Sequence, residues 1–228
     1  MVATTTSSLV EWCTSRPVTT VDHSCTSAAA IARWRCERVV ATTVQPFTIA
    51  SSAIEGLIFI APKVVDEDRG AVREFFRLSA FEEVGITALG RFVQINVTQT
   101  LPGAIRGMHA EDMHKLVGVV AGTAFGAWVD LRPGPNFATV VTADMYLGVQ
   151  VLVPPGVANG FQATGTSPCQ YVYAFDDEWV PDMAGTAVTP LDAELGIPWP
   201  IVPRPDDPAS VSVKDASAPT LAEVREAV

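Results

Sequence analysis

Short apolar or alternating segments, separated by Gly and Pro, constrain the fold of this chain more than any other feature of its sequence. They include Gly56–Val65, Arg91–Thr98, Gln150–Val153 and Gln170–Phe175, and no long amphipathic helix interrupts them. The turns between them recur near the roughly 8–12 residues that are typical of sandwiches and barrels. The sequence therefore predicts a mostly-β fold, a double-sheet sandwich or jelly roll with short peripheral helices.

The first 50 residues differ from the rest of the chain. They are rich in Thr, Ser, Ala and Val, and only Ser27–Val40 carries the pattern of a short helix. We predict an N-terminal extension over residues 1–50, weakly structured or partly helical, and a jelly-roll domain with a C-terminal tail over residues 51–228. The tail is predicted to end in a short helix over Thr220–Val228.

Charge and cysteine content narrow the class of protein. A net charge of -10 argues against a nucleic-acid partner, because phosphate neutralisation requires a basic face. No run of about 20 apolar residues predicts a membrane span. The four cysteines include no CxxC pair, and the first residues lack the pattern of a secretory signal. We predict a cytoplasmic protein with free thiols.

The segment Arg106–Arg132 concentrates reactive side chains, and it reads RGMHAEDMHKLVGVVAGTAFGAWVDLR. Its first part carries the reactive side chains at a strand edge, and its apolar remainder predicts strands that pair with each other. His109, Glu111 and His114 resemble metal ligands, but the two histidines are five residues apart and do not share a strand face. The turn that supplies a distant histidine in jelly-roll metal sites ends here in Asn159. The residues therefore do not encode a complete histidine-rich site for a transition metal, and we predict no metal.

Proton transfer suits the same segment better. A histidine near neutral pKa is a suitable general base, and His109 is available. Lys115 is placed to stabilise an enolate oxygen as charge develops. A tyrosine across the cavity would return the proton, and the residues alone leave Tyr171 and Tyr173 as alternatives for that acid, each equally compatible with core packing.

Seven motifs, in order, resemble the dTDP-4-dehydrorhamnose 3,5-epimerase family of the cupin superfamily. They cover most of the chain after residue 56 and read APKVVDEDRG, FVQINV, AIRGMH, HKLVGVVAGTAFGAWVDLR, VPPGVANGF, LGIPWP and SVKDASAPTL. The resemblance implies a homodimeric, cupin-like double-stranded β-helix. It also implies cofactor-free epimerisation, at C3, C5 or both, of a nucleotide-linked 4-keto-6-deoxyhexose. The expected nucleotide is dTDP, and the expected pathway is deoxysugar biosynthesis such as that of dTDP-rhamnose.

The resemblance also assigns roles to individual residues. His109 matches the base, Asp215 the aspartate that orients it, Lys115 the lysine near the keto oxygen, and Tyr173 the acid. The remaining matches are substrate-binding positions. Arg69, Arg106 and Lys214 match residues that hold the pyrophosphate or sugar, Glu74, Gln94 and Asn96 match the nucleotide end, and Trp179 matches a ring that stacks on the base.

Some contact positions depart from the family pattern. Asn159 replaces a histidine that helps to bind the sugar, and Ala184 stands where a glutamate often contacts the ligand. Val65 replaces a frequent aromatic residue, and Gly126 an acidic one. These departures predict a changed substrate or a single epimerised centre. Two alternatives remain: a non-catalytic sugar-nucleotide-binding jelly roll, and a metal-dependent oxygenase or isomerase on the same fold.

Overall fold

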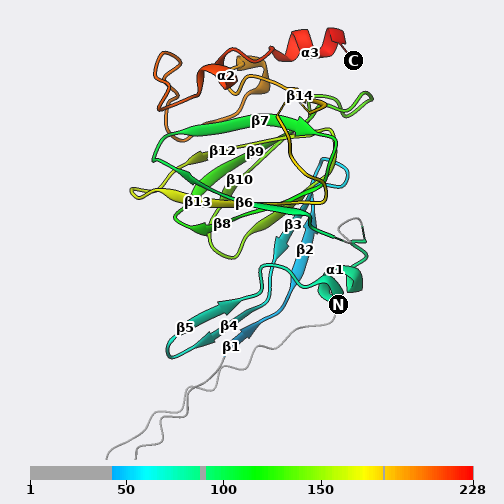
Figure 1. Cartoon of the computed structure of the whole chain (residues 1–228), viewed down its shortest axis with the longest axis vertical. Helices are drawn as coiled ribbons and strands as arrows, with labels where there is room; N and C mark the ends of the chain where they lie inside the picture. The colour runs from blue at the N-terminus through cyan, green and yellow to red at the C-terminus, as the bar shows by residue number, and fades with distance from the viewer. Residues whose placement is uncertain (1–42, 88–90, 182, 228) are drawn as a thin grey trace, which may run out of the picture. The chain divides into compact units, whose positions relative to one another are not determined.

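A computed structural model describes residues 43–87, 91–181 and 183–227. The helix predicted over Ser27–Val40 and three of the four cysteines lie outside these residues. Three antiparallel sheets organise the described part of the chain (Figure 1). The predicted mostly-β, double-sheet fold with short helices is confirmed. No helix among the described residues is long and apolar enough to cross a membrane.

The two larger sheets face each other. The six-stranded sheet has the order β2-β3-β11-β8-β13-β6. Its strands are β2 (Thr48–Ser51), β3 (Ile58–Ala61), β11 (Gln150–Val153), β8 (Lys115–Ala121), β13 (Cys169–Phe175) and β6 (Gln94–Thr100). The five-stranded sheet has the order β10-β9-β12-β7-β14. Its strands are β10 (Val140–Met145), β9 (Ala124–Asp130), β12 (Val157–Ala163), β7 (Ile105–Glu111) and β14 (Gly185–Ala187).

The smaller elements lie outside this sandwich. A three-stranded sheet contains β1 (Thr43–Gln45), β4 (Val64–Glu67) and β5 (Gly70–Arg73), in the order β1-β4-β5. The helices are α1 (Leu78–Glu83), α2 (Val213–Ala216) and α3 (Leu221–Ala227), with a single 3₁₀ turn, η1 (Ala193–Leu195). The helix α3 confirms the predicted C-terminal helix.

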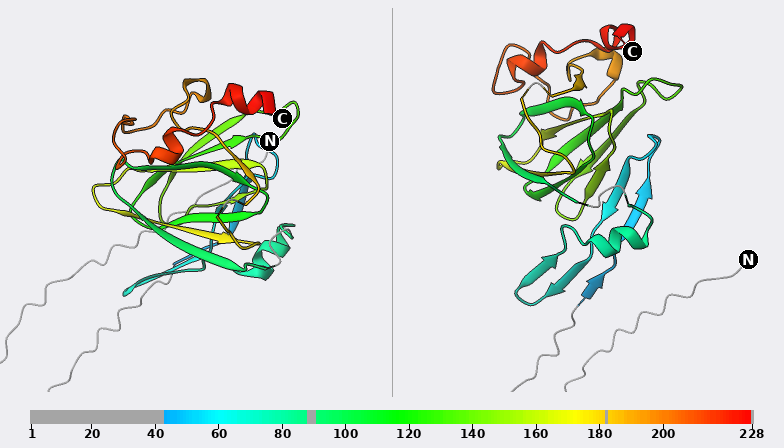
Figure 2. Two further views of the ribbon diagram at one scale, coloured as in Figure 1. Left: turned by 45° about the horizontal axis from the view of Figure 1, so that its top comes forward. Right: turned by 45° about the vertical axis from the view of Figure 1, so that its right-hand side comes forward.

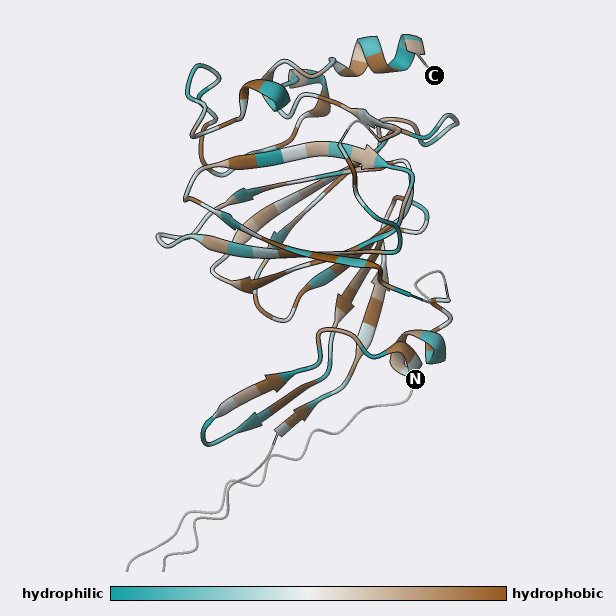
Figure 3. Cartoon of the chain, viewed as in Figure 1, coloured by the Kyte–Doolittle hydropathy of each residue, from teal (hydrophilic) through white to brown (hydrophobic). Residues whose placement is uncertain are grey.

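The main core lies between the two large sheets, whose strands are drawn from two further directions in Figure 2. Val117 and Val119 of β8 meet Trp128 of β9 and Phe161 of β12 there, all of them buried. The preceding residue of β8, Leu116, points the other way, into a second cluster with Phe81 of α1. Period-2 alternation thus gives β8 two buried faces, which explains its nearly continuous apolar sequence. Figure 3 shows hydrophobic residues along these strands and hydrophilic ones at the turn between β4 and β5.

The expectation that the strands of Arg106–Arg132 pair with each other is wrong. Strand β8 pairs with β11 and β13, whereas β9 pairs with β10 and β12 in the opposite sheet. The chain crosses between sheets after Ala121, at Gly122 with a φ of +79°. Because each strand needs an apolar face toward the shared core, the local pattern is the same for a hairpin and for such a crossing.

The C-terminal segment returns to β7. Ile105 at the start of β7 forms a parallel bridge with Val211, and helix α2 packs on the same strand. Leu221 and Val224 of α3 are buried against the outer face of the five-stranded sheet, together with Val129. This packing brings residues from the end of the sequence to the mouth of the sandwich, beside β7.

Candidate active site

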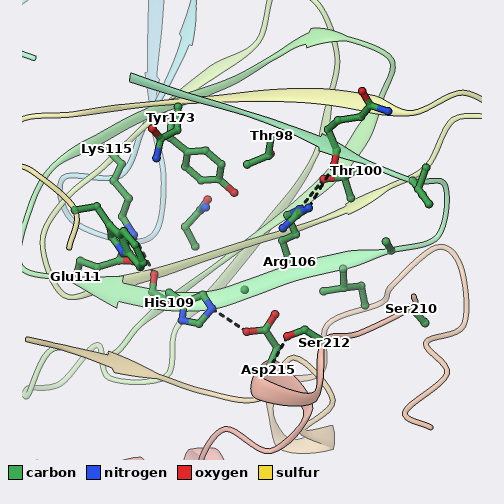
Figure 4. A pocket seen from close by; sticks show the side chains of 18 of the residues that line it. Thr98, Thr100, Arg106, His109, Glu111, Lys115, Tyr173, Ser210, Ser212 and Asp215 are labelled. Carbon is green, nitrogen blue, oxygen red and sulfur yellow. Dashed lines mark hydrogen bonds and ion pairs between the residues drawn. The ribbon is translucent and has the colours of Figure 1, made fainter. Parts of the chain in front are cut away.

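A cavity of about 660 Å³ opens between strands β6, β7, β8 and β13 and the C-terminal segment (Figure 4). This volume is within the roughly 300–1,000 Å³ of typical ligand sites. Eight of the predicted catalytic and substrate-binding residues line it: Asn96, Arg106, His109, Lys115, Asn159, Tyr173, Trp179 and Asp215.

His109 and Asp215 form a hydrogen-bonded pair at the cavity wall. Nε2 of His109 lies 2.9 Å from Oδ1 of Asp215, and the two side chains are 34% and 10% exposed. Ser212 caps helix α2 by accepting a hydrogen bond from the Asp215 amide at 3.0 Å, which fixes the start of the short helix. Since a carboxylate only accepts hydrogen bonds, Nε2 carries the proton and Nδ1 keeps its lone pair.

The Asp215 carboxylate is held in its charged form. Burial alone would raise its pKa, but the hydrogen bond and charge of His109, with help from Ser212, outweigh burial and lower the pKa of Asp215 below its ordinary value. A charged Asp215 favours the imidazolium that forms when His109 accepts a proton. The pair is therefore arranged as a general base with an orienting carboxylate.

Gly107 lets strand β7 approach strand β12 closely. Its φ is +115°, and a Cβ atom there would lie 2.6 Å from both the Asn159 carbonyl oxygen and the Gly160 Cα. Real Cβ atoms do not tolerate such contacts with backbone, so position 107 requires glycine. Because His109 follows two residues later, this close approach also sets the position of the imidazole.

Lys115 lies at the first position of β8 and is buried, with 3% of its side chain exposed. Its Nζ donates a hydrogen bond to the His109 carbonyl oxygen at 3.0 Å and forms an ion pair with Glu111. Burial lowers the pKa of Lys115, and the negative charge of Glu111 opposes this shift. The ammonium therefore lies beside the His109 backbone, where it could stabilise negative charge on a substrate oxygen.

Tyr173 and Tyr171 have different surroundings, although both lie on the same face of β13. Tyr173 lines the cavity, and Figure 4 shows its ring projecting into the space above the His109 side chain. Tyr171 is fully buried and stacks on Phe161, with ring centroids 4.0 Å apart. Burial raises the pKa of Tyr173, so the phenol retains its proton over the physiological range. Of the two tyrosines, only Tyr173 is placed to return a proton.

Arg106 brings a fixed positive charge to the other side of the cavity. Its Nε donates to Thr100 Oγ1 at 2.8 Å, and its Nη2 donates to the Gln99 carbonyl at 3.3 Å. Asn96 and Trp179 line the same cavity. Gln94 supports these two residues, because its amide donates to Asn96 Oδ1 at 3.1 Å and its oxygen accepts from the Trp179 amide at 2.8 Å.

Four predicted binding residues do not line this cavity, and one of them, Gln94, supports two residues that do. Arg69, at the turn between β4 and β5, pairs with Glu67 and is 85% exposed. Glu74 pairs with Arg77 beyond the end of β5. Lys214 is exposed on α2, one residue before Asp215.

The departures from the family pattern have different structural settings. Asn159 is 4% exposed, lies opposite His109 in the register of β12 and β7, and has no hydrogen bond to Oδ1 among the described residues. At Gly126 a Cβ atom would lie 2.4 Å from the Trp128 ring, so the glycine makes room for this core side chain. Val65 lies in β4, opposite Val44, and nothing in the structure explains Ala184.

Several cavity residues were not assigned to substrate binding from the sequence. Thr98 and Thr100 continue the alternation of Asn96 along β6, so the period-2 pattern could have found them. Ser212 is recognisable as a helix cap. The sequence indicates Glu111 only as a candidate metal ligand, because its approach to Lys115 depends on the turn between β7 and β8.

The second histidine of the segment has a separate setting. His114 Nδ1 lies 2.8 Å from Asp176 Oδ2, and the His114 amide donates to Asp176 Oδ1 at 2.8 Å. These contacts join the start of β8 to the end of β13. Within the part of the chain that the structure describes, no group of three or more His, Cys, Asp or Glu residues is arranged to hold a metal ion.

The fold and the cavity define a class of protein: a double-sheet β protein with a His–Asp pair, a lysine and a tyrosine around one pocket. Such a set suits proton abstraction from carbon next to a carbonyl group. The family model described as dTDP-4-dehydrorhamnose 3,5-epimerase matches residues 51–223. The chain belongs to this family.

Individual relatives agree with this assignment. A protein of Streptococcus pyogenes named Protein RmlC homolog is 33% identical over 75% of this chain and 88% of its own length. A dTDP-4-dehydro-6-deoxyglucose 3-epimerase of Streptomyces bikiniensis is 31% identical over 75% of this chain and 87% of its own. The crystal structure of dTDP-6-deoxy-D-glucose-3,5-epimerase from Legionella pneumophila, in complex with dTDP-4-keto-L-rhamnose, is 32% identical with a TM-score of 0.69, over 78% of this chain and 94% of that one.

Proposed function

We propose that this chain catalyses epimerisation of a dTDP-linked 4-keto-6-deoxyhexose at C3, C5 or both, without a cofactor. One observation carries the proposal: the His109–Asp215 pair, Lys115 and Tyr173 come from separate elements and line a single cavity. The family membership supports the same substrate class, since one solved relative holds a dTDP-linked keto sugar.

The proposed reaction is a proton exchange across one carbon. The C4 carbonyl acidifies the neighbouring C–H, and Nδ1 of His109 takes that proton while the bonding electrons form an enolate. Lys115 stabilises the enolate oxygen. The Tyr173 hydroxyl then donates its proton to the opposite face of the carbon, which leaves a phenolate and an imidazolium, and proton exchange with water restores both groups. No net oxidation or reduction occurs.

Substrate binding is assigned to the other cavity side chains. We propose that Arg106 pairs with the diphosphate, because a guanidinium offers the paired donors that phosphate groups accept. Its local charge allows an acidic chain to bind an anion.

Asn96, with Gln94 behind it, would bind the nucleotide end, and the Trp179 ring would stack on the base. Asn159 supplies a buried acceptor for a sugar hydroxyl. Lys214, Arg69 and Glu74 stay proposed contacts outside this cavity.

The decisive experiment measures solvent deuterium entering the carbons next to C4. The purified protein is incubated in D₂O with dTDP-4-keto-6-deoxyglucose and related sugars, and C3 and C5 are followed by NMR. Exchange in the native chain and its loss in His109→Ala support the epimerase. Lack of exchange on every sugar, with retained binding, would favour the non-catalytic binding protein.

The same spectra test regiochemistry. The altered contact positions Asn159 and Ala184 favour a changed substrate or a single epimerised centre. Deuterium at one carbon only, with inversion there, is the expected result. Exchange and inversion at both C3 and C5 would contradict the single-centre version while leaving the epimerase proposal intact.

We also propose that the chain is a homodimer. Ile95 and Val97 form an apolar row on the outer face of edge strand β6 and are 63% and 59% exposed. Exposed apolar rows of this kind favour association. Arg69 and Glu74 lie outside the cavity of their own chain. In the proposed homodimer, they would contact substrate bound in the cavity of the second copy. Light scattering coupled to gel filtration gives the molar mass, and a monomer at micromolar concentration would refute this arrangement.

The proposed domain division assigns the catalytic jelly roll to residues 51–228 and an extension to residues 1–50. Strand β1 lies before this boundary and pairs with β4, whereas β2 reaches the boundary and pairs with β3. The extension therefore contributes to two edge strands. Truncation at residue 42, which keeps both strands, is expected to retain activity. A cytoplasmic location stays a prediction.

A further inference from the structure

The buried ammonium of Lys115 has a single carboxylate partner among the described residues, and the partner is Glu111. Their side chains are 3% and 15% exposed. Both residues line the cavity, and Figure 4 shows them together beside the His109 backbone. Neither the base nor the acid of the proposed reaction uses Glu111, so its placement requires another explanation.

The contacts of Lys115 leave one donor unused. An ammonium has three N–H groups. One donates to the His109 carbonyl oxygen and one to the Glu111 carboxylate. The two partners are close together on β7, so they hold Nζ from one side. The remaining N–H is available to a group in the cavity.

The surroundings make Glu111 the source of the balancing charge. The residues that pair with Lys115 across the neighbouring strands, Val153 of β11 and Phe175 of β13, are apolar. Of the other ionisable groups that line the cavity, Asp215 is bound to His109, Arg106 is positive, and Tyr173 keeps its proton. Burial lowers the pKa of Lys115, and the charge of Glu111 is the opposing influence.

We propose that Glu111 is a positioning residue, which keeps Lys115 protonated and directs its free N–H at the carbonyl oxygen of the substrate. The inference rests on the proposed function and extends it. Without the carboxylate, a lysine in this buried place would lose its proton more readily. A neutral amine stabilises an enolate less, and because that charge exists mainly in the transition state, the loss would fall on kcat more than on KM.

The first test needs no substrate. The chain contains three lysines, Lys63, Lys115 and Lys214, so their side-chain signals can be followed by NMR after isotope labelling and assigned with Lys63→Arg and Lys214→Arg. In Glu111→Gln the Lys115 midpoint is expected to fall by about 1–3 pH units. The matched control Glu194→Gln removes the same charge from an exposed pair with Arg225 and should leave that midpoint unchanged.

The second test follows the rate against pH, with dTDP-4-keto-6-deoxyglucose as the substrate. The alkaline limb of the pH–rate profile of Glu111→Gln should move to lower pH by the same amount as the Lys115 midpoint. Above that midpoint, kcat should fall about tenfold per pH unit. A second variant, Glu111→Asp, keeps the negative charge but shortens the side chain by one methylene, which moves the carboxylate away from Lys115. It should keep the midpoint near that of the native chain and still lose kcat, because the ammonium is misplaced.

These results separate the inference from the function on which it rests. An unshifted Lys115 midpoint in Glu111→Gln, or full kcat in Glu111→Asp, overturns the role of Glu111 even when the native chain is active. A merely structural role would lower the melting temperature and move neither the midpoint nor the alkaline limb. Absence of exchange in the native chain defeats the epimerase proposal, whereas the lysine titration still decides whether Glu111 holds the proton on Lys115.

Discussion

His109 and Asp215 lie 106 residues apart in the sequence, yet Nε2 of the imidazole and Oδ1 of the carboxylate are 2.9 Å apart. Strand β7 carries the histidine, and the capped start of helix α2 carries the aspartate. The C-terminal segment packs on β7 and thereby completes the base. Any change that releases α2 from β7 should therefore inactivate the site without unfolding the sandwich.

Asp215→Asn is the sharpest test of this pair. An amide can donate to Nε2 as well as accept from it, so the imidazole loses its fixed tautomer and the charge that supports imidazolium. We expect kcat to fall about 10²- to 10⁴-fold with little change in KM. Steady-state kinetics at neutral pH measure this. An Asp215→Asn enzyme with native kcat would show that the carboxylate does not orient the base.

Asp215 should also make stability depend on pH. Its pKa is lower in the folded chain than its ordinary value of 3.8, so its stabilising contribution is complete above that ordinary value. The contribution is lost as the pH falls through the lowered pKa of the folded state. The difference in free energy of unfolding between native and Asp215→Asn chains, measured by denaturant titration, should thus shrink below pH 4. A difference that grows there would contradict the assignment.

Arg106→Met tests substrate binding separately from chemistry. The guanidinium is held by Thr100 and the Gln99 carbonyl and carries charge at the cavity wall. Removing charged hydrogen bonds that form equally in the ground and transition states costs about 1.5–3 kcal/mol of binding. KM should rise about 10- to 150-fold with kcat nearly unchanged, and the native KM should increase with salt. A fall in kcat at constant KM would instead place Arg106 in the chemical step.

Gly107→Ala should disrupt the approach of β7 to β12. The added Cβ would lie 2.6 Å from backbone atoms of Asn159 and Gly160, which cannot move without breaking the register. Overpacking of this kind costs about 1–3 kcal/mol, and His109 would shift with the strand. Gly148→Ala is the control, because φ is +100° there but the space is open. Thermal unfolding and kcat should both fall more in Gly107→Ala than in Gly148→Ala.

Much of the fold followed from the sequence because alternation along a strand fixes which side chains share a face. The polar row that includes Asn96 lines the cavity, and the row with Ile95 and Val97 faces outward. Alternation does not identify the neighbouring strand, however. The apolar runs of β8 and β9 fit a hairpin as well as two facing sheets, and only the packing of the whole domain selects the second arrangement.

The site shows the same division. The family resemblance predicts that Asp215 orients His109, because the motif SVKDASAPTL near the C-terminal end carries the matching aspartate. The residues alone do not decide whether Tyr171 or Tyr173 is the acid, because residues two positions apart on one strand share a face. The structure distinguishes them, since Tyr171 is buried in the core and Tyr173 lines the cavity. Glu111 could not be paired with Lys115 from the sequence, since their approach depends on how the chain turns between β7 and β8.

Tyr173→Phe tests the last step of the proposed reaction. The ring remains, but the hydroxyl that would protonate the enolate is removed. We expect His109 to continue removing and returning protons on its own face, so deuterium exchange should persist while inversion falls about 10²- to 10⁴-fold. NMR of the sugar in D₂O measures both rates in one sample. If both exchange and inversion are lost, Tyr173 acts in deprotonation or in substrate binding instead.

Tyr171→Phe is the matched control, because it removes the same atom from the next inward-facing position of β13. The Tyr171 hydroxyl is buried and has no hydrogen-bond partner among the described residues. Replacing an unpaired buried hydroxyl by hydrogen relieves a desolvation penalty of about 1–3 kcal/mol, so this variant should be as stable as the native chain or more stable. Its exchange and inversion rates should be native. A Tyr171→Phe enzyme that exchanges without inverting, beside an unaffected Tyr173→Phe enzyme, would reverse the roles of the two tyrosines and place the acid in the core.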